Sequence, residues 1–245
     1  ILSLLALLPA SALAQNTWFV PDDFSTIQAG IDGSVNGDTV IVRDGTYVEN
    51  INFNGMAITL KSENGSATTI IDGRWGGSVV TFNNGEGSNS VFDGFTVTEG
   101  TTTYGGGMSC VDYSSPTLEN CTFTGNEADY GGGMYCYWYS SPTLENCAFT
   151  NNTAVYTGGG MFCGGNLPAT LNNCTFTNNT ATKGGGAYFS SNSSPTLDNC
   201  TFTDNTVIYD GGGMSCRDYS SPILDNCLFE KNSAQYGGGL ACWFS

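Results

Sequence analysis

Residues Gly105 to Tyr130 read GGGMSCVDYSSPTLENCTFTGNEADY, and this stretch recurs along the chain, with its last copy incomplete. The copies open on glycine triplets spaced 26 or 27 residues apart, which begin at Gly105, Gly131, Gly158, Gly184, Gly211 and Gly237. A fixed period of this size is typical of a solenoid, in which each repeat buries its apolar face against its neighbours. The repeat therefore decides the architecture.

Aligned copies of the repeat show apolar positions that alternate with variable ones. In the first copy these positions are Met108 and Cys110, then Leu118, and then Cys121 and Phe123. A period of two is typical of a strand that turns one face inward. We therefore predict three short strands in each repeat, close to GMSCV, TLE and CTFT in the first copy.

Two columns of asparagine mark the ends of the predicted strands. The first column separates the second strand from the third and contains Asn120, Asn146, Asn173, Asn199 and Asn226. The second column ends the third strand and contains Asn126, Asn152, Asn179, Asn205 and Asn232. Asparagine tolerates the left-handed backbone region, and side chains stacked at a strand spacing of roughly 4.8 Å can also bond to one another. We predict that both columns, like the glycine triplets, form corners.

The stretch from Leu118 to Asn126 also fits the leucine-rich-repeat pattern, whose strand is usually followed by a helix or an extended turn. Here the return path holds the glycine triplet, an alternating segment and Ser-Ser-Pro. Glycine and proline oppose helix formation. We therefore favour an all-β solenoid of three strands per coil over a horseshoe.

The GGGM segments, together with FTGN, FTNN, FTDN and FEKN, resemble the GGAI and FxxN repeats of chlamydial-type polymorphic outer membrane proteins. More widely, the chain is similar to right-handed parallel β-helices of the pectin-lyase-like class. The repeat resemblance covers residues 105–245 and departs at the third position, where glycine replaces alanine. It implies a right-handed parallel β-helix with a passenger-type location at the surface or outside the cell, but no particular activity.

The N-terminal part divides into two segments. Residues 1–14 read ILSLLALLPASALA, which predicts a secretory signal peptide that is incomplete at its N-terminus. Residues 15–104 are predicted to form an N-terminal cap and irregular coils, before regular repeats over 105–245 that are truncated at the C-terminus. Ser25 and Gln28 fit a capping box for a short helix with Ile27 and Ile31 on one face. The stretch VPDDFSTIQAGID resembles the opening of pectin-lyase-like β-helices, where such a helix covers the open end of the first coil.

Composition limits the partners. The chain has 22 acidic and 6 basic residues and no histidine, for a net charge of −16. This charge repels nucleic acid, anionic membrane surfaces and acidic polysaccharides, and the missing histidine excludes histidine-based triads within these residues. Beyond residues 1–14, no apolar run is long enough to span a membrane. We predict no catalytic residue, no cofactor and no metal site.

Two surface columns raise binding hypotheses. An acidic column is predicted to point outward and contains Glu119, Glu145, Asn172, Asp198 and Asp225. We favour a solvated stripe over a calcium site, because no Asp-x-Asp-type loop accompanies it. Tyr113, Trp138, Tyr139 and Tyr219 precede Ser-Ser-Pro and would form a ridge able to stack on sugars, although packing over the adjoining turn is the favoured interpretation.

The ten cysteines stand in two inward columns. In four coils the two cysteines are separated by eleven residues, as in Cys110 and Cys121, and this repeated spacing would permit one disulfide within each of these coils. Phe189 replaces the first cysteine of one coil while Cys200 remains, and a core column tolerates such an apolar exchange better than a bonded pair does. We therefore predict mostly unpaired, buried thiols.

The leading functional prediction is a secreted or surface-displayed β-helix module for adhesion, recognition or structural display, located at the outer membrane or outside the cell. Its partner would be a surface glycan or a protein ligand, and its oligomeric state is open. The alternative is a polysaccharide-degrading enzyme of the pectate-lyase type whose site is missing or unrecognised. An exposed groove with clustered carboxylates and a basic residue would favour the enzyme, and smooth repeated faces the module.

Overall fold

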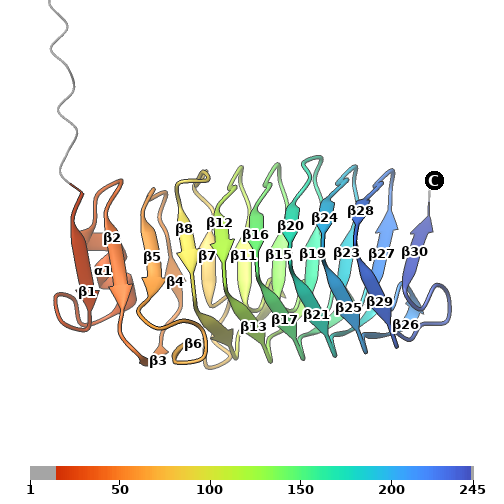
Figure 1. Cartoon of the computed structure of the whole chain (residues 1–245), viewed down its shortest axis with the longest axis horizontal. Coiled ribbons are helices and arrows are strands. Elements are labelled where there is room, and N and C mark those ends of the chain that lie inside the picture. The colour runs from red at the N-terminus through yellow and green to blue at the C-terminus, as the bar shows by residue number, and fades with distance from the viewer. Residues whose placement is uncertain (1–14, 244–245) are drawn as a thin grey trace, which may run out of the picture.

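The computed structural model describes residues 15–243 and forms one elongated parallel β-solenoid (Figure 1). Its axis runs from the N-terminal coil to the C-terminal coil, and each coil contributes one strand to each sheet that it joins. The predicted all-β solenoid is therefore confirmed. The signal-peptide prediction for residues 1–14 lies outside the described residues.

Sheets A and B hold the predicted second and third strands of each repeat. Sheet A contains β1 (Thr17–Val20), β2 (Thr39–Val42), β5 (Thr59–Ser62), β8 (Val91–Asp93), β12 (Thr117–Glu119), β16 (Thr143–Glu145), β20 (Thr170–Asn172), β24 (Thr196–Asp198) and β28 (Ile223–Asp225). Sheet B contains β3 (Gly45–Val48), β6 (Thr69–Asp72), β9 (Thr96–Thr98), β13 (Thr122–Thr124), β17 (Ala148–Thr150), β21 (Thr175–Thr177), β25 (Thr201–Thr203) and β29 (Leu228–Glu230).

Sheet C holds the strands that follow the glycine triplets, and a short sheet D, which the sequence did not predict, precedes them. Sheet C contains β4 (Ile51–Asn52), β7 (Val80–Phe82), β11 (Met108–Cys110), β15 (Met134–Cys136), β19 (Met161–Cys163), β23 (Ala187–Phe189), β27 (Met214–Arg217) and β30 (Leu240–Trp243). Sheet D contains β10 (Thr101–Tyr104), β14 (Glu127–Tyr130), β18 (Thr153–Thr157), β22 (Thr180–Lys183) and β26 (Thr206–Asp210). The regular coils thus have four strands.

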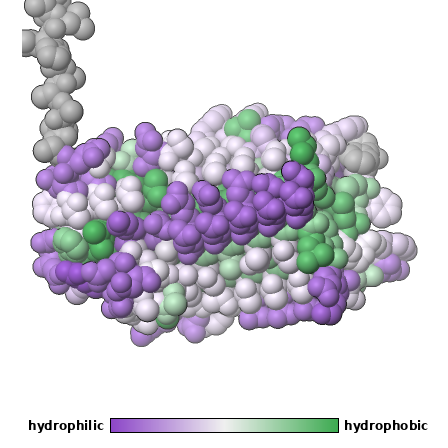
Figure 2. All heavy atoms as spheres, viewed as in Figure 1, coloured by the Kyte–Doolittle hydropathy of each residue, from purple (hydrophilic) through white to green (hydrophobic). Residues whose placement is uncertain are grey.

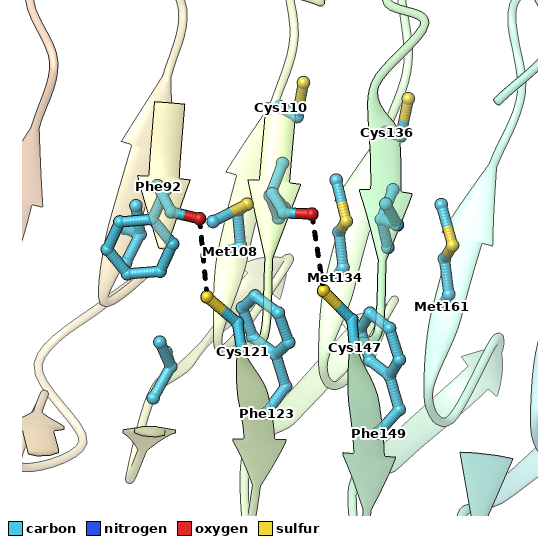
Figure 3. Packing of buried hydrophobic residues seen from close by; sticks show 14 of the residues in the cluster. Phe92, Met108, Cys110, Cys121, Phe123, Met134, Cys136, Cys147, Phe149 and Met161 are labelled. Atoms are coloured by element: carbon cyan, nitrogen blue, oxygen red, sulfur yellow. Dashed lines mark hydrogen bonds between the residues drawn. The ribbon is translucent and has the colours of Figure 1, made fainter. Parts of the chain in front are cut away.

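Equivalent positions of successive repeats pair in register, so the columns of the sequence become ladders in space. Met108 pairs with Met134, and Phe123 with Phe149. The phenylalanine rings of the Phe123 column stack inside the solenoid with centroids 4.6 to 4.9 Å apart and interplanar angles of 1° to 10°. Cys121 lies beside this stack, and its thiol donates to the Phe92 carbonyl at 3.5 Å (Figure 3).

The first asparagine column forms left-handed corners, as predicted, with Asn120 at φ 53° and its counterparts close to that value. The second column differs from the prediction. There the residue before the asparagine is left-handed, as in Asn151 at φ 56°, while Asn152 is fully buried. The side-chain nitrogen of Asn152 donates to Asn179 Oδ1 at 3.1 Å and to the Phe123 carbonyl at 2.9 Å. The second column is therefore a buried amide ladder that binds each coil to the next.

Helix α1 (Ile27–Gly33) covers the first coil, as predicted, and buries Ile27 and Ile31. Its N-cap is Thr26, whose hydroxyl accepts from the Ala29 amide at 3.1 Å, so the predicted Ser25 cap is wrong by one residue. The side chain of Gln28 is used elsewhere, because it donates to the carbonyl of Asn52 at 3.0 Å.

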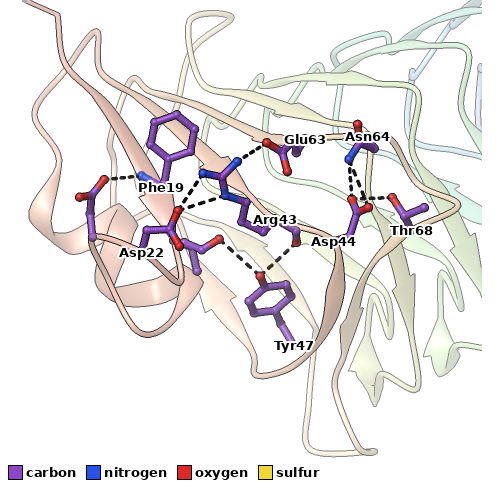
Figure 4. A network of polar contacts seen from close by, with 10 residues as sticks. Phe19, Asp22, Arg43, Asp44, Tyr47, Glu63, Asn64 and Thr68 are labelled. Atoms are coloured by element: carbon purple, nitrogen blue, oxygen red, sulfur yellow. Dashed lines mark hydrogen bonds and ion pairs between the residues drawn. The ribbon is translucent and has the colours of Figure 1, made fainter.

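A polar network braces this cap from outside (Figure 4). Arg43 donates to Asp22 at 2.8 Å, forms an ion pair with Glu63, and lies 4.6 Å from the centroid of the Phe19 ring. Tyr47 donates its hydroxyl proton to the Arg43 carbonyl at 3.0 Å. The network ties the cap to the second and third strands of sheet A.

All ten cysteines are free in the structure, and eight of them are buried. Burial raises the pKa of the Cys136 thiol, and a hydrogen bond with Cys174 together with burial raises that of Cys200. The reactive form is the thiolate. We therefore expect an alkylating reagent to modify exposed Cys242 quickly in the native protein and the buried thiols hardly at all. Unfolding without reductant should then expose ten thiols, whereas a count near zero would show disulfides.

Candidate binding groove

A concave corner lies outside the solenoid where sheet D meets sheet C. Each glycine triplet turns the chain from one sheet to the other, and its first glycine is left-handed, as in Gly131 at φ 66°. The strands of sheet C point Met134 and Cys136 inward, so the residue between them, Tyr135, points out into this corner. Phe162 and Tyr188 follow Tyr135 in the same column.

Aromatic side chains from both sheets meet in the corner. Tyr104 of sheet D lies 5.6 Å from Tyr130 and 4.9 Å from Tyr135 of sheet C, measured between ring centroids. Tyr135 stacks on Phe162 at 4.9 Å, and Phe162 stacks on Tyr188 at 5.5 Å. These contacts form a continuous aromatic stack that crosses four coils outside the main core; Tyr104 is exposed, whereas Phe162 and Tyr188 are buried at its far end.

This surface borders a cavity of about 580 Å³, which we call the aromatic groove. Its aromatic lining consists of Tyr104, Tyr130, Tyr135, Tyr137, Trp138 and Phe162, and the remaining lining residues are Ser109, Val111, Ser190 and Ser191. No charged side chain of the described residues lines the groove. Its surface therefore offers flat rings and hydroxyl groups.

Burial keeps the tyrosine hydroxyls protonated. It raises the pKa of Tyr135 well above its usual value and that of Tyr188 to about 12. At neutral pH these hydroxyls are uncharged and can donate or accept hydrogen bonds. The groove combines apolar ring faces with neutral polar groups, a combination suited to amphipathic ligands.

The predicted exposed ridge is only partly assembled. Tyr113 and Tyr139 stack with centroids 5.3 Å apart on neighbouring turns. Tyr219 belongs to the same column, but Asn166 and Asn192 occupy the two turns between it and Tyr139. The fourth ridge residue, Trp138, lines the aromatic groove instead.

Sequence reasoning missed most of the groove because the two columns that build it are split by the glycine triplet. Tyr104 and Tyr130 each stand directly before a glycine triplet, and Tyr135 stands two residues after the triplet that follows Tyr130. Aromatic residues on both sides of an invariant corner were the available signal. That signal identifies a site only once the strands of sheet D are known, because they set where Tyr104 and Tyr130 lie.

The acidic column points outward, as predicted. Glu145 and Asp225 are exposed and the other members are half-buried, and Figure 2 shows a hydrophilic band along the face that carries sheet A. Burial and the charges of Asp93 and Glu145 raise the pKa of Glu119. Within residues 15–243 no group of three or more acidic or cysteine side chains is arranged to hold a metal ion.

Comparison with known proteins gives a family match over most of the chain. The model of a family described as a right handed beta helix region matches residues 29–182 and 162–243. No curated protein and no solved structure matches significantly. In the described part of the chain, no helix has the length and apolar character needed to cross a membrane.

Proposed function

Because the chain belongs to the family of right-handed β-helix regions, its activity depends on the residues its faces carry, and we propose that it is a module that binds glycan chains in the aromatic groove. The observation that carries this proposal is the uncharged, aromatic cavity of about 580 Å³ between sheets C and D. Sugar rings present an apolar face and polar edges, which flat aromatic rings and neutral hydroxyls can match.

The groove also has the extended form that a polymer needs. Tyr104 and Tyr130 pair on adjacent strands of sheet D and both line the groove, so their spacing is about 4.8 Å and their line runs along the solenoid axis, while Tyr135 and Trp138 add ring faces beside them. A chain ligand lying on this line would contact several rings at once. Repeated weak contacts of this kind favour polymers over single sugars.

We further propose that the module acts outside the cell, secreted or displayed at the surface for adhesion or recognition. Two sequence features support this location. The apolar segment 1–14 has the character of a secretory signal peptide, and the repeats resemble those of polymorphic outer membrane proteins. A net charge of −16 is also compatible with solubility in that setting.

Glycan binding is tested with the double variant Tyr104→Thr/Tyr130→Thr. Threonine fits this column, because Thr157 pairs with Tyr130 in the next coil. Aromatic contacts contribute roughly 0.5–1.5 kcal/mol each, so affinity should fall about tenfold. The measurement is calorimetric titration with neutral hexasaccharides of β-linked glucose, xylose and N-acetylglucosamine.

The matched control is Tyr219→Asn, which removes an exposed tyrosine outside the groove and places there the residue found at Asn166 and Asn192. Its affinity should equal that of the unchanged protein. Failure of every hexasaccharide to bind, or equal loss in both variants, would contradict the proposal.

The polysaccharide-degrading alternative predicts turnover, and we expect none. Glycoside hydrolysis needs two carboxyl groups flanking the bond, and elimination needs a free base. Among the described residues no carboxyl group lines the groove, and Asp210, which lies farther along the same corner, is held at 2.6 Å by Arg217 and at 2.7 Å by Ser215. Incubation with the hexasaccharides and with uronic-acid polymers, with and without calcium, should produce no new reducing or unsaturated ends. Steady product formation would favour the enzyme instead.

A further inference from the structure

A second hollow, of about 390 Å³, lies on the same corner closer to the C-terminal coil. We call it the charged hollow; its lining consists of Lys183, Tyr209, Asp210, Arg217, Tyr236 and Trp243. Tyr188 lies between the two hollows and is buried, because its ring stacks on Phe162 and its strand pairs with that of Ser215 and Arg217.

The hollow forms where two columns of the repeat change character. The position before the glycine triplet is Tyr104 and Tyr130 in the aromatic groove, but Lys183 and Asp210 here. The position after the inward cysteine is Val111 and Tyr137 in earlier coils, but becomes Arg217 and then Trp243. Both departures fall on neighbouring strands, so the repeat is broken at one place in space.

Among the charged residues that line the hollow, Lys183 is the one without an ion-pair partner in the described part of the chain. Arg217 contacts Asp210 at 2.6 Å, and Ser215 donates its hydroxyl proton to the other oxygen of Asp210 at 2.7 Å. Asp210 is only 3% exposed, so it offsets Arg217 from behind. Within residues 15–243, no carboxylate lies within ion-pair distance of Lys183.

Arg217 has bonding capacity left. Its Nη2 is bonded to Asp210 and its Nε is buried, which leaves Nη1 without a hydrogen-bond partner among the described residues, and its guanidinium carbon lies 5.6 Å from the centroid of the Trp243 ring. An arginine packed against an aromatic face keeps its planar edge available for an oxyanion. Asp218 follows Arg217 in the chain but does not line the hollow.

We propose that the charged hollow binds an oxyanion, a carboxylate or a sulfate, carried by a sugar of the glycan in the aromatic groove. Lys183 supplies the unmatched positive charge, Arg217 supplies donors, and Tyr236 and Trp243 supply ring faces. The identity of the carrier as a glycan rests on the proposed function. The overall charge of −16, which predicted repulsion of acidic polysaccharides, does not extend to this position, because the lining holds two basic residues, Lys183 and Arg217, and one acidic residue, Asp210, which is paired with Arg217.

The geometry also sets a distance between the two sites. Tyr135 and Ser215 belong to one column of sheet C and are separated by three strand spacings, or about 14 Å. The bound chain would therefore reach the charged hollow with a sugar a few units away from those on the aromatic groove. Only a charged group on that sugar unit would contact Lys183 and strengthen binding.

The test compares three ligands with one backbone: cellohexaose, its C6-oxidised uronate form and its 6-O-sulfated form. Methyl β-glucuronide and glucose 6-sulfate are added as single-sugar probes, with Trp243 fluorescence as the readout and Trp243→Phe as the signal control. An ion pair of partly exposed groups predicts about fivefold tighter binding of the charged ligands. Lys183→Gln should remove that preference.

The matched control is Lys61→Gln on β5, which changes the net charge equally but lies on sheet A. It should leave the preference intact. Equal binding of charged and neutral ligands, or equal effects of the two lysine variants, would overturn the proposal. Binding of charged single sugars without any hexasaccharide binding would support the charged hollow and contradict the glycan groove. Binding of the hexasaccharides without binding of the charged single sugars would contradict only the charged hollow. Comparing the uronate ligands with the sulfated ligands shows which of the two anions the hollow binds.

Discussion

Replacing Asn152 by alanine is expected to lower the free energy of unfolding by about 4 kcal/mol, on the scale of several buried groups left without partners. Asn152 is fully buried. Its side-chain oxygen accepts from both the backbone and the side-chain nitrogen of Asn126 at 3.1 Å. Its side-chain nitrogen donates to Phe123 and Asn179. Alanine would remove all of these bonds while leaving the Asn126 amide and the Phe123 carbonyl buried.

The comparison variant is Asn146→Gly in the exposed corner column. Asn146 has φ 54°, which glycine adopts freely, and its side chain makes one bond, to Asn120 at 3.2 Å. We expect a change of about 0.5 kcal/mol or less. Urea unfolding followed by tryptophan fluorescence and by circular dichroism measures both. Similar losses of unfolding free energy in the two variants would show that the buried amide ladder contributes no more to stability than the exposed corner column.

The second large effect is expected from Gly159→Ala, at a cost of about 3 kcal/mol from overpacking. A Cβ atom at Gly159 would lie 2.5 Å from the Thr180 carbonyl oxygen and 2.6 Å from that of Gly185. Both obstacles are backbone atoms of the next coil, so no side chain can rotate away. The coils would have to separate locally, which would weaken the corner that carries the aromatic groove.

Gly87→Ala serves as its control, because a Cβ there meets nothing within 4 Å and its φ is not left-handed. It should be neutral, or stabilising by about 0.5 kcal/mol through the unfolded state. Thermal unfolding of both variants provides the measurement. A Gly159 variant as stable as the Gly87 variant would show that the solenoid corner yields easily.

The ladders were predictable because a solenoid repeats one environment. Columns such as Met108 and Phe123 reveal their inward direction through period two, and each further copy repeats the signal. Corners were harder, because asparagine serves two purposes. Asn120 is left-handed and exposed, whereas Asn126 is buried and bonded, and a single column of letters does not distinguish these environments.

Sheet D escaped prediction for a different physical reason. Its strands carry few buried residues, such as Ala128 and Ala154, so they lack the apolar alternation that identifies a strand. They form because the adjacent coils hold their backbone in register. Since the aromatic groove lies against sheet D, the candidate site could not be assembled from the sequence even though each tyrosine was visible.

In-register stacking fixes the distance between the aromatic groove and the charged hollow by the number of coils between them. Duplicating the coil that carries Phe162, a change of 26 or 27 residues, would keep the strands paired in register and would add one more ring to the Tyr135 column. It would move the charged hollow away from Tyr135 by one strand spacing, about 4.8 Å. Selection on coil number could therefore retune the pattern of charged units that a polymer must present, without altering a single binding residue.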